Sequence, residues 1–339
     1  MKRLIMILGF GALLIAASHT WQSKPLKLIY PNSWPKPAYD TDRNPLTEAG
    51  VWLGRNLFYD PALSKDNTIS CASCHLSFTA FTHVDHELSH GIDDRIGTRN
   101  SPVLINLAWN KSFMWDGAVN HLDMQALAPI SHPNEMGSSI TEVVEKLAPN
   151  PNYKTWCFQA FGDSNLTGEY MLKALAQFQL TLVSDNSKYD QMQRGEITFS
   201  AQETRGYDLF KAKCNSCHTE PLFTNGSFQN NGLSLDSLLS DSGRMMVTKN
   251  DADNRTFKVP TLRNIEFSKP YMHDGRFKSL SQVMNHYQSG IEASNTLAKE
   301  LENSIALNEN EKIDLVAFLM TLSDREFLFN PEFGYPSGK

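Results

Sequence analysis

Several classes of protein are excluded by what the sequence lacks. No cluster of Lys and Arg interrupts its 339 residues and the formal net charge is −6, so we do not expect nucleic acid as a partner. Beyond one apolar run near the N-terminus, no stretch is long enough to span a membrane. Alternation of apolar and polar residues is scarce, and we therefore expect a mainly α fold.

Cysteine is also scarce, with five residues in the chain. Four of them lie in the segments Cys71–His75 and Cys214–His218, which read CASCH and CNSCH. Cys157 is left without a free partner, so an intrachain disulfide is not expected. Its apolar neighbours favour a buried thiol.

Both cysteine segments follow the pattern C-x-x-C-H. In this pattern the two thiols bond covalently to the vinyl groups of a haem, and the imidazole of the next residue ligates the iron. Zinc is the alternative for a cysteine pair, but it needs four ligands together, and each pair carries its own histidine instead. We predict two haem c sites, formed by Cys71, Cys74 and His75 and by Cys214, Cys217 and His218.

The N-terminus reads as a secretory leader over residues 1–18. Lys2 and Arg3 precede an apolar run, which ends in small residues. An uncleaved membrane anchor is the alternative. Because bacteria attach c-type haem outside the cytoplasm, we expect an exported, periplasmic protein that is soluble after removal of the leader.

Apolar residues at helical spacing predict most of the secondary structure. Ser139 and Ser200 each have a Glu three residues later, which is typical of a capping box. The polar loop 224–256 is too long to be a simple connector. The expected helices span 47–59, 139–148, 169–182, 200–210 and 312–322. In the last of these, the residues expected to face inward are Ile313, Val316, Ala317 and Met320.

An internal repeat predicts two similar domains. The segment Pro102–Asn106 matches Pro260–Asn264, and Phe113–Gly117 matches Tyr271–Gly275 with the same offset. Duplication of one cytochrome c-like haem domain explains this pattern. The expected parts are a signal peptide over 1–18, an N-terminal haem domain over 19–190 and a C-terminal haem domain over 191–339.

The two halves differ where a second iron ligand would stand. A helix from about Ser279 puts Met284 and Tyr287 on one face, and either side chain could reach the second iron. The residue that matches Tyr287 in the first half is Pro129, which cannot ligate a metal. An open iron can bind an oxidant such as peroxide, whereas a six-coordinate iron is suited to passing electrons. The alternative for Tyr287 is a core aromatic residue.

The same comparison marks residues that could assist peroxide cleavage. Breaking the O–O bond requires a base that takes a proton from the near oxygen and returns it to the leaving one. Glu135 suits that role and Gln125 could orient the peroxide, although a surface glutamate is the plain alternative. Trp115 stands where the second half has His273. It is either a stop for an electron between haems or simply a packed indole.

Together these motifs resemble the bacterial dihaem cytochrome c peroxidase family, which includes the methylamine-utilisation enzyme MauG. The resemblance covers about residues 45–325. It rests on both C-x-x-C-H segments, Arg99-Asn100-x-Pro102, Trp115–Gly117, Val259–Asn264 and Pro270–Gly275. It implies that His75 is proximal to a peroxidatic haem and His218 to an electron-transfer haem.

The resemblance also assigns roles around the haems. It implies a distal pocket of Gln125, Pro129 and the acid/base Glu135, with Trp115 between the haems. It further implies an inter-haem calcium site, made by Asn100 with backbone oxygens near Ser268 and Pro270.

The chain departs from the usual family pattern at two places. The second haem usually carries a Met ligand, but this chain has Tyr287, as in MauG, with Met284 as the rival. A hard anionic oxygen stabilises ferric iron and should lower the potential. His90 resembles the distal histidine that blocks the first haem until the second is reduced. His83 and His86 are alternatives, or all three are solvated loop residues.

We therefore predict a peroxidase that reduces hydrogen peroxide to water with electrons from a small redox protein, either a cytochrome c or a copper protein. One alternative is MauG-like, peroxide-dependent oxidation of an aromatic side chain on a partner protein. Another is a dihaem electron carrier, although a carrier needs neither an open iron nor a distal acid. The resemblance also makes a homodimer an expectation.

Overall fold

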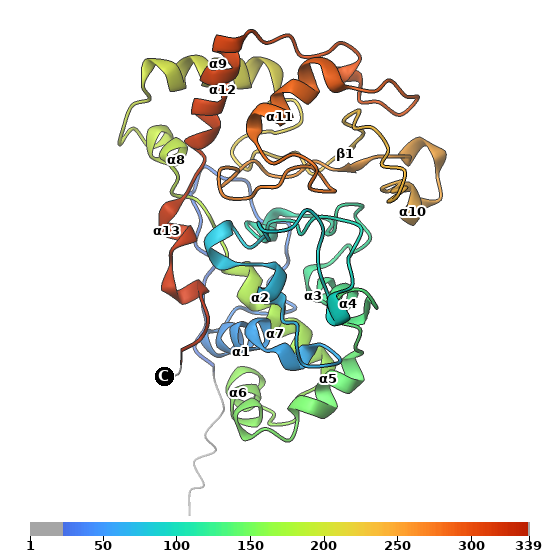
Figure 1. The fold of residues 1–339 in the computed structure, drawn as a ribbon. Helices are drawn as coiled ribbons and strands as arrows, with labels where there is room; N and C mark the ends of the chain where they lie inside the picture. Colours follow the sequence, from blue (N-terminus) through green and yellow to red (C-terminus); the bar gives the residue numbers. More distant parts are fainter. Residues whose placement is uncertain (1–22, 338–339) are drawn as a thin grey trace, which may run out of the picture.

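A computed structural model describes residues 23–337, so the predicted leader lies outside the described residues. Figure 1 shows two helical bodies, with α1 to α7 in the lower body and α8, α9, α11 and α12 in the upper body. The only sheet in the described part pairs two short strands, β1 and β2, in antiparallel fashion. The predicted helix-rich fold is therefore confirmed.

The helices and strands have the following bounds. The lower body contains α1 (Glu48–Tyr59), α2 (Cys71–Cys74), α3 (Leu122–Gln125), α4 (Leu127–Ser131), α5 (Ile140–Leu147), α6 (Pro151–Phe161) and α7 (Gly168–Leu180). The rest of the chain contains α8 (Lys188–Gln193), α9 (Ala201–Lys213), β1 (Phe228–Gln229), α10 (Met245–Thr248), β2 (Phe257–Lys258), α11 (Leu280–Asn285), α12 (Glu309–Met320) and α13 (Arg325–Leu328). A π-helical turn, His286–Gly290, continues α11.

The first core forms where α1 crosses α7. The side chain of Thr47 caps α1 by accepting the N–H of Gly50 at 3.0 Å. At the crossing, a Cβ on Gly54 would lie only 1.9 Å from the carbonyl oxygen of Ala174, so only glycine allows this approach. The stripe Leu53, Leu57 and Phe58 is thereby buried. This pair of helices holds the segment that leads into the first cysteine pair.

The second core forms where α9 crosses α12. Here a Cβ on Gly206 would lie 1.9 Å from the carbonyl oxygen of Asp314, as at the first crossing. The predicted inward face of α12 was wrong at Ile313 and Met320, which are 57% and 40% exposed, whereas Val316 packs against this core as predicted. The buried stripe is instead Leu315, Phe318 and Leu319. Both stripes have helical spacing, and α9 covers the one with the larger Leu and Phe side chains.

Helix starts follow the predicted caps, with one difference. At α9 the capping box is complete, because Ser200 accepts the N–H of Glu203 and the Glu203 carboxylate accepts the N–H of Ser200. At α5, Ser139 accepts the N–H of Glu142. The Glu142 carboxylate, however, accepts the hydroxyl of Ser138 at 3.3 Å. The helix therefore forms with half of the predicted box.

The C-terminal segment returns to the first body, as Figure 1 shows for α13 and the chain end. Leu328 is buried in the first core. Arg55 donates to the carbonyl of Pro331 at 2.7 Å, and the Tyr59 hydroxyl donates to the carbonyl of Phe333 at 2.8 Å. The first core thus includes residues from beyond the predicted boundary at position 190.

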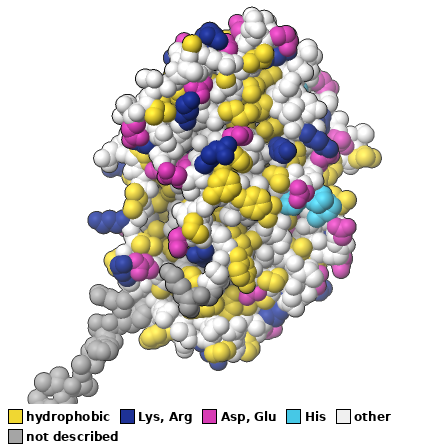
Figure 2. Space-filling view, turned by 60° about the vertical axis from the view of Figure 1, so that its left-hand side comes forward, with side chains coloured by type: hydrophobic (Ala, Val, Ile, Leu, Met, Phe, Trp, Pro, Cys, Tyr) yellow, Lys and Arg dark blue, Asp and Glu magenta, His cyan; other side chains and the backbone are white. Residues whose placement is uncertain are grey.

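The surface in Figure 2 carries acidic and basic side chains interspersed over the face in view. Over residues 23–337, none of the helices combines the length and the apolar character that crossing a membrane requires. Cys157 is buried, as predicted, and its Sγ lies 3.7 Å from the carbonyl oxygen of Asn165.

Candidate functional site

The first cysteine pair lies on a single helical turn, α2, with both thiols half-buried and unpaired. His75 follows directly and leaves the helix. Its Nδ1 lies 2.7 Å from the carbonyl oxygen of Phe81. A proton on Nδ1 makes this bond and leaves Nε2 free as a ligand. Burial lowers the pKa of His75 to about 4, so its imidazole is neutral at neutral pH.

The second cysteine pair repeats this arrangement. Cys214 directly follows α9 as its C-cap, and His218 has its Nδ1 3.2 Å from the carbonyl oxygen of Phe223 and 3.1 Å from that of Pro260. Burial lowers the pKa of His218 as well. Backbone carbonyls therefore orient both imidazoles in the same sense.

These donors fit two haem c groups. Each site offers two unpaired thiols and one neutral imidazole with a free Nε2, which is the set that haem attachment uses. Zinc would require several ligands together, and residues 23–337 contain no cluster of three or more His, Cys, Asp or Glu able to hold a metal ion. The structure therefore favours haem over the zinc alternative at both pairs.

Glu135 lies beside the first cysteine pair. Burial raises the pKa of Cys71 to about 12 and that of Cys74 to about 11, and the Glu135 carboxylate adds to both shifts. Burial also raises the pKa of Glu135. His132 opposes that shift, and its Nδ1 lies 3.9 Å from Oε1 of Glu135. The Glu135 side chain is 32% exposed. It is thus a half-buried carboxyl that faces the first haem site.

Gln125 ends α3, and its Nε2 lies 3.8 Å from the Sδ of Met114. Pro129 lies within α4, where its carbonyl accepts the N–H of Met136. No hydrogen bond of the described part joins Gln125 to Glu135. The two predicted distal residues therefore stand on separate short segments.

Tyr287 lies beside the second cysteine pair. Burial raises the pKa of its phenol to about 12, with an opposing hydrogen bond from the side chain of Asn231 and further raising by charge on Cys214 and Cys217. The rival ligand Met284 is 7% exposed and packs in the second core. Tyr287 is thus close enough to the two thiols for their charge to act on its phenol. The π-helical turn places it there, and such turns recur at functional sites.

Asn231 was not predicted. Its Oδ1 accepts the N–H of Leu233 at 3.2 Å, which fixes the amide, and its Nδ2 lies 3.3 Å from the Sδ of Met272. Met272 matches Met114 in the repeat, and both have positive φ, at 76° and 69°. An amide therefore contacts the matching methionine in each half, from Gln125 in one and from Asn231 in the other. The only sequence signal was the long polar loop that contains Asn231.

The segments around Trp115 join the two bodies by reciprocal bonds. The N–H of Asn100 donates to the carbonyl of His273 at 2.7 Å, and the N–H of Lys258 donates to the carbonyl of Trp115 at 2.7 Å. The Trp115 indole N–H donates to the carbonyl of Asn100 at 2.9 Å. The ring of His273 stacks on Phe257, with centroids 3.7 Å apart. The structure thus places Trp115 at the join between the two haem-binding bodies.

Arg99 clamps the same join, which sequence reasoning did not find. Its guanidinium donates to both carboxylate oxygens of Asp241, at 2.6 and 2.9 Å, and to Asp116 at 2.6 Å. Burial lowers the pKa of Arg99, but the two carboxylates outweigh it and hold that pKa above its ordinary value. Arg244 from the same polar loop donates to the carbonyl of Asp116 at 3.0 Å. The long loop therefore holds the two bodies together.

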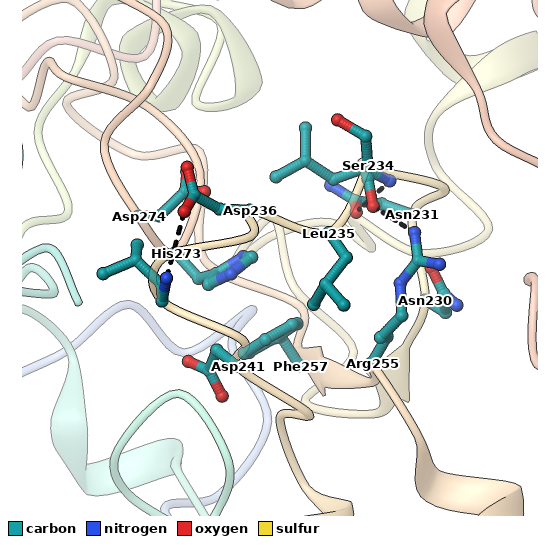
Figure 3. A pocket seen from close by; sticks show the side chains of 12 residues that line it. Asn230, Asn231, Ser234, Leu235, Asp236, Asp241, Arg255, Phe257, His273 and Asp274 are labelled. Carbon is teal, nitrogen blue, oxygen red and sulfur yellow. Dashed lines mark hydrogen bonds between the residues drawn. The ribbon is translucent and has the colours of Figure 1, made fainter. Parts of the chain in front are cut away.

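A small pocket lies in the second body beside this join, and all its lining residues fall between Asn230 and Asp274. Figure 3 shows His273, Phe257 and Asp241 on one side of it and Asn231 and Arg255 on the other. Asn231 and His273 thus line one space, although they come from distant parts of the chain.

The loop histidines form a stack. The rings of His83 and His86 lie 5.0 Å apart and those of His86 and His90 lie 4.3 Å apart, nearly parallel in both cases. The Nδ1 of His90 is 2.8 Å from the Asp94 carboxylate. The backbone carbonyl of His90 lies 3.5 Å from the Sγ of Cys74, so this segment borders the first haem site. Its role as an iron ligand stays a prediction.

The predicted calcium site also stays a prediction. Asn100 is buried, and its Nδ2 donates to the carbonyl of Glu87 at 3.0 Å. Among the hydrogen bonds of the described residues, none connects Asn100 with Ser268 or Pro270.

Comparison with known proteins places this chain among dihaem enzymes. Residues 48–198 match the family model for di-haem cytochrome c peroxidase. The chain is 38% identical to the methylamine utilization protein MauG of Methylorubrum extorquens, over 86% of this chain and 82% of that protein. It is 36% identical to the cytochrome c551 peroxidase of Nitrosomonas europaea, over 84% and 81% of the two chains.

Solved structures give the same picture of the fold. A MauG-like protein associated with microbial copper homeostasis superposes with a TM-score of 0.83 at 31% identity, over 92% of this chain and 99% of that one. The diheme peroxidase BthA from Burkholderia thailandensis shares the fold, with a TM-score of 0.71 at 21% identity over 86% and 90% of the two chains.

Proposed function

The chain belongs to the di-haem cytochrome c peroxidase family of oxidoreductases, and from that premise we propose that it reduces hydrogen peroxide to water at the first of its two haem sites. The family implies two haem c groups. In the proposed reaction one peroxide takes up two electrons and two protons and yields two water molecules. A small redox protein, a cytochrome c or a copper protein, supplies the electrons.

One observation carries the proposal, namely the half-buried Glu135 beside Cys71 and Cys74. Burial raises the pKa of this carboxyl, which brings it closer to the pKa range in which a group can both accept and return a proton. The second site has a phenol, Tyr287, near its thiols. The two sites are therefore suited to different tasks.

A haem held by Cys71, Cys74 and His75 would supply an iron that binds peroxide and accepts its oxidising equivalents. Glu135 takes the proton from the near peroxide oxygen on a carboxylate oxygen and returns it to the leaving oxygen as water forms. The Gln125 amide orients the peroxide by hydrogen bonding. Pro129, which has no ligating atom, leaves that side of the site open.

The second site serves as the electron relay in this proposal. His218 and Tyr287 are its proposed iron ligands, and the Asn231 side chain lowers the pKa of the phenol, for which we propose a hydrogen bond from its amide to the phenol oxygen. Trp115, at the join between the two bodies, lies on the proposed route between the sites. We propose the same route for electrons from the donor protein.

A second candidate function is favoured by Tyr287. An anionic oxygen ligand stabilises ferric iron and so favours the storage of oxidising equivalents at the second site. The resemblance to MauG at 38% identity agrees with this reading. The stored equivalents would then oxidise an aromatic side chain on a partner protein.

Donor stoichiometry separates these two functions. Peroxide is added to the holoprotein in the presence of a reduced cytochrome c or a reduced copper protein, and both consumption of peroxide and oxidation of the donor are followed. For the peroxidase we expect two donor molecules oxidised per peroxide consumed. Peroxide consumption without oxidation of either donor would contradict it and favour protein oxidation.

We also propose that the two haem-binding bodies arose by duplication. The matching glycine crossings, at Gly54 and Gly206, and the reciprocal bonds between the bodies support this. Export to the periplasm is proposed from the leader-like residues 1–18 and from the haem c sites. Calcium at Asn100 and a homodimer remain proposals that rest on the family resemblance.

A further inference from the structure

We infer that Lys258 binds a propionate carboxylate of one of the two haems. Lys258 ends β2 and is half-buried. Its Nζ donates to the carbonyl of Ser112 at 2.9 Å and lies 5.9 Å from the ring centroid of Phe113. An ammonium group has three N–H donors, so one carbonyl leaves it incompletely satisfied.

No acidic side chain within residues 23–337 forms a salt bridge with Lys258. Five buried or half-buried arginines have carboxylate partners, in the pairs Arg55–Glu332, Arg99–Asp241, Arg255–Glu292, Arg263–Asp190 and Arg276–Asp274, whereas the half-buried Arg244 donates to the carbonyl of Asp116 and lies over the ring of Phe228. A buried charge is costly unless it is paired. Burial alone lowers the pKa of Lys258 to about 8, with no carboxylate to oppose the shift. An anion that is not part of the polypeptide is therefore expected beside it.

The position of Lys258 indicates which anion this is. Two residues further along the chain, the carbonyl of Pro260 lies 3.1 Å from Nδ1 of His218, the proximal residue of the second site. On the other side, Ser112 and Phe113 directly precede Met114, which contacts Gln125 of the first site. Lys258 thus lies between the segments that face the two haems. Haem propionates are the anions that both sites bring.

This pairing has a consequence for electron transfer. A fixed positive charge near a haem disfavours its ferric form, which carries one more positive charge than the ferrous form. Lys258 would therefore raise the potential of the haem whose propionate it holds. The inference rests on haem attachment and not on the reaction proposed above, so failure of one leaves the other standing.

The test is a redox titration of both haems in the holoprotein, comparing wild type with Lys258→Met. We expect the ferric–ferrous equilibrium constant of one haem to shift about tenfold toward ferric, which is about 59 mV for one electron. Whichever haem shifts is the one whose propionate is held. Lys111→Met is the matched control, because Lys111 is exposed and adjacent to Ser112, and it should shift neither haem appreciably.

A second variant keeps the inference testable if Lys258→Met fails to retain both haems. Lys258→Arg keeps the charge but changes the donor geometry. We expect the ferric–ferrous equilibrium constant of each haem in this variant to stay within about twofold of the wild-type value. Its resonance Raman propionate bending mode should nevertheless shift. Unchanged potentials in Lys258→Met, or an unchanged propionate mode in Lys258→Arg, would overturn the inference.

Discussion

The two haem-binding bodies share their frame and differ in the side chains beside their cysteine pairs. In each body a glycine, Gly54 or Gly206, lets two helices cross in contact, and a backbone carbonyl orients the proximal histidine. These shared features depend on backbone geometry. They would hold the haem and one iron ligand in each body, and they do not constrain the other side chains beside the cysteine pairs.

Those side chains differ between the two bodies. The first has Glu135 near its thiols, whereas the second has Tyr287. The residue that matches Tyr287 in the repeat is Pro129, which has no donor atom to offer. The same backbone frame can therefore support an iron with an open coordination position in one body and an iron with that position filled in the other, through a few differences in side chains.

The largest effect is expected from Glu135→Gln, which removes the proton acceptor from the first site. General acid–base catalysis contributes about 100- to 10,000-fold, and we expect peroxide turnover to fall by that order. Steady-state peroxide consumption measures it, with haem content checked for both sites. The wild-type rate should also decline on acidification, because protonation of Glu135 removes the base. Since burial raises the pKa of Glu135, this decline should begin at a pH above the pKa of an exposed glutamate.

Glu145→Gln is the control for this substitution, because Glu145 is exposed on the nearby helix α5. It should retain the wild-type rate. Wild-type turnover in Glu135→Gln would remove the main difference between the two bodies.

The next effect concerns the join between the bodies. Arg99→Met leaves Asp116 and Asp241 without their partner, and their side chains are only 12% and 5% exposed. We expect the free energy of unfolding to fall by about 3 kcal/mol, as measured by urea denaturation of the holoprotein.

Arg194→Met is the matched control, because Arg194 makes a two-bond pair with Glu196 in which the two side chains are 38% and 52% exposed. It should cost less than about 1 kcal/mol. Equal losses in the two variants would show that Arg99 is no more important than a surface pair.

A smaller effect is expected from Tyr287→Phe, which removes the proposed oxygen ligand of the second haem. Loss of an anionic ligand should raise the reduction potential of that haem. We expect its ferric–ferrous equilibrium constant to change by about tenfold or more. Its absorption spectrum should change as well. Met284→Leu tests the rival ligand and should alter neither property. The opposite result, a change in Met284→Leu alone, would exchange the two assignments.

The smallest effect is expected from Asn231→Leu, which removes the amide donor of the hydrogen bond that we propose to Tyr287. Without that donor the phenol oxygen binds iron more strongly, so the reduction potential of the second haem should fall. We expect its ferric–ferrous equilibrium constant to change by less than about tenfold. Gln125→Leu is the counterpart in the first body and should leave the second haem unchanged. A rise in potential for Asn231→Leu would contradict the proposed hydrogen bond.

How much could be predicted from the sequence depends on whether a feature is local. The C-x-x-C-H segments and the helix that begins after Ser200 follow from residues close together in the chain. The face of α12 was wrong because two apolar stripes share one spacing, and only the packing of α9 selects between them. Asn231 and the pairing of Arg99 with Asp241 were missed because their partners come from distant segments. Loop residues of this kind carry no periodic signal.

The division of labour between the two sites is tested most directly by low-temperature EPR of the fully oxidised protein and of the protein after addition of one electron per molecule. We expect a high-spin ferric signal from an open first site, together with a low-spin signal from a second site ligated by His218 and Tyr287. Tyr287→Phe should change the low-spin signal alone. The absence of a high-spin signal in both redox states would contradict an open first site.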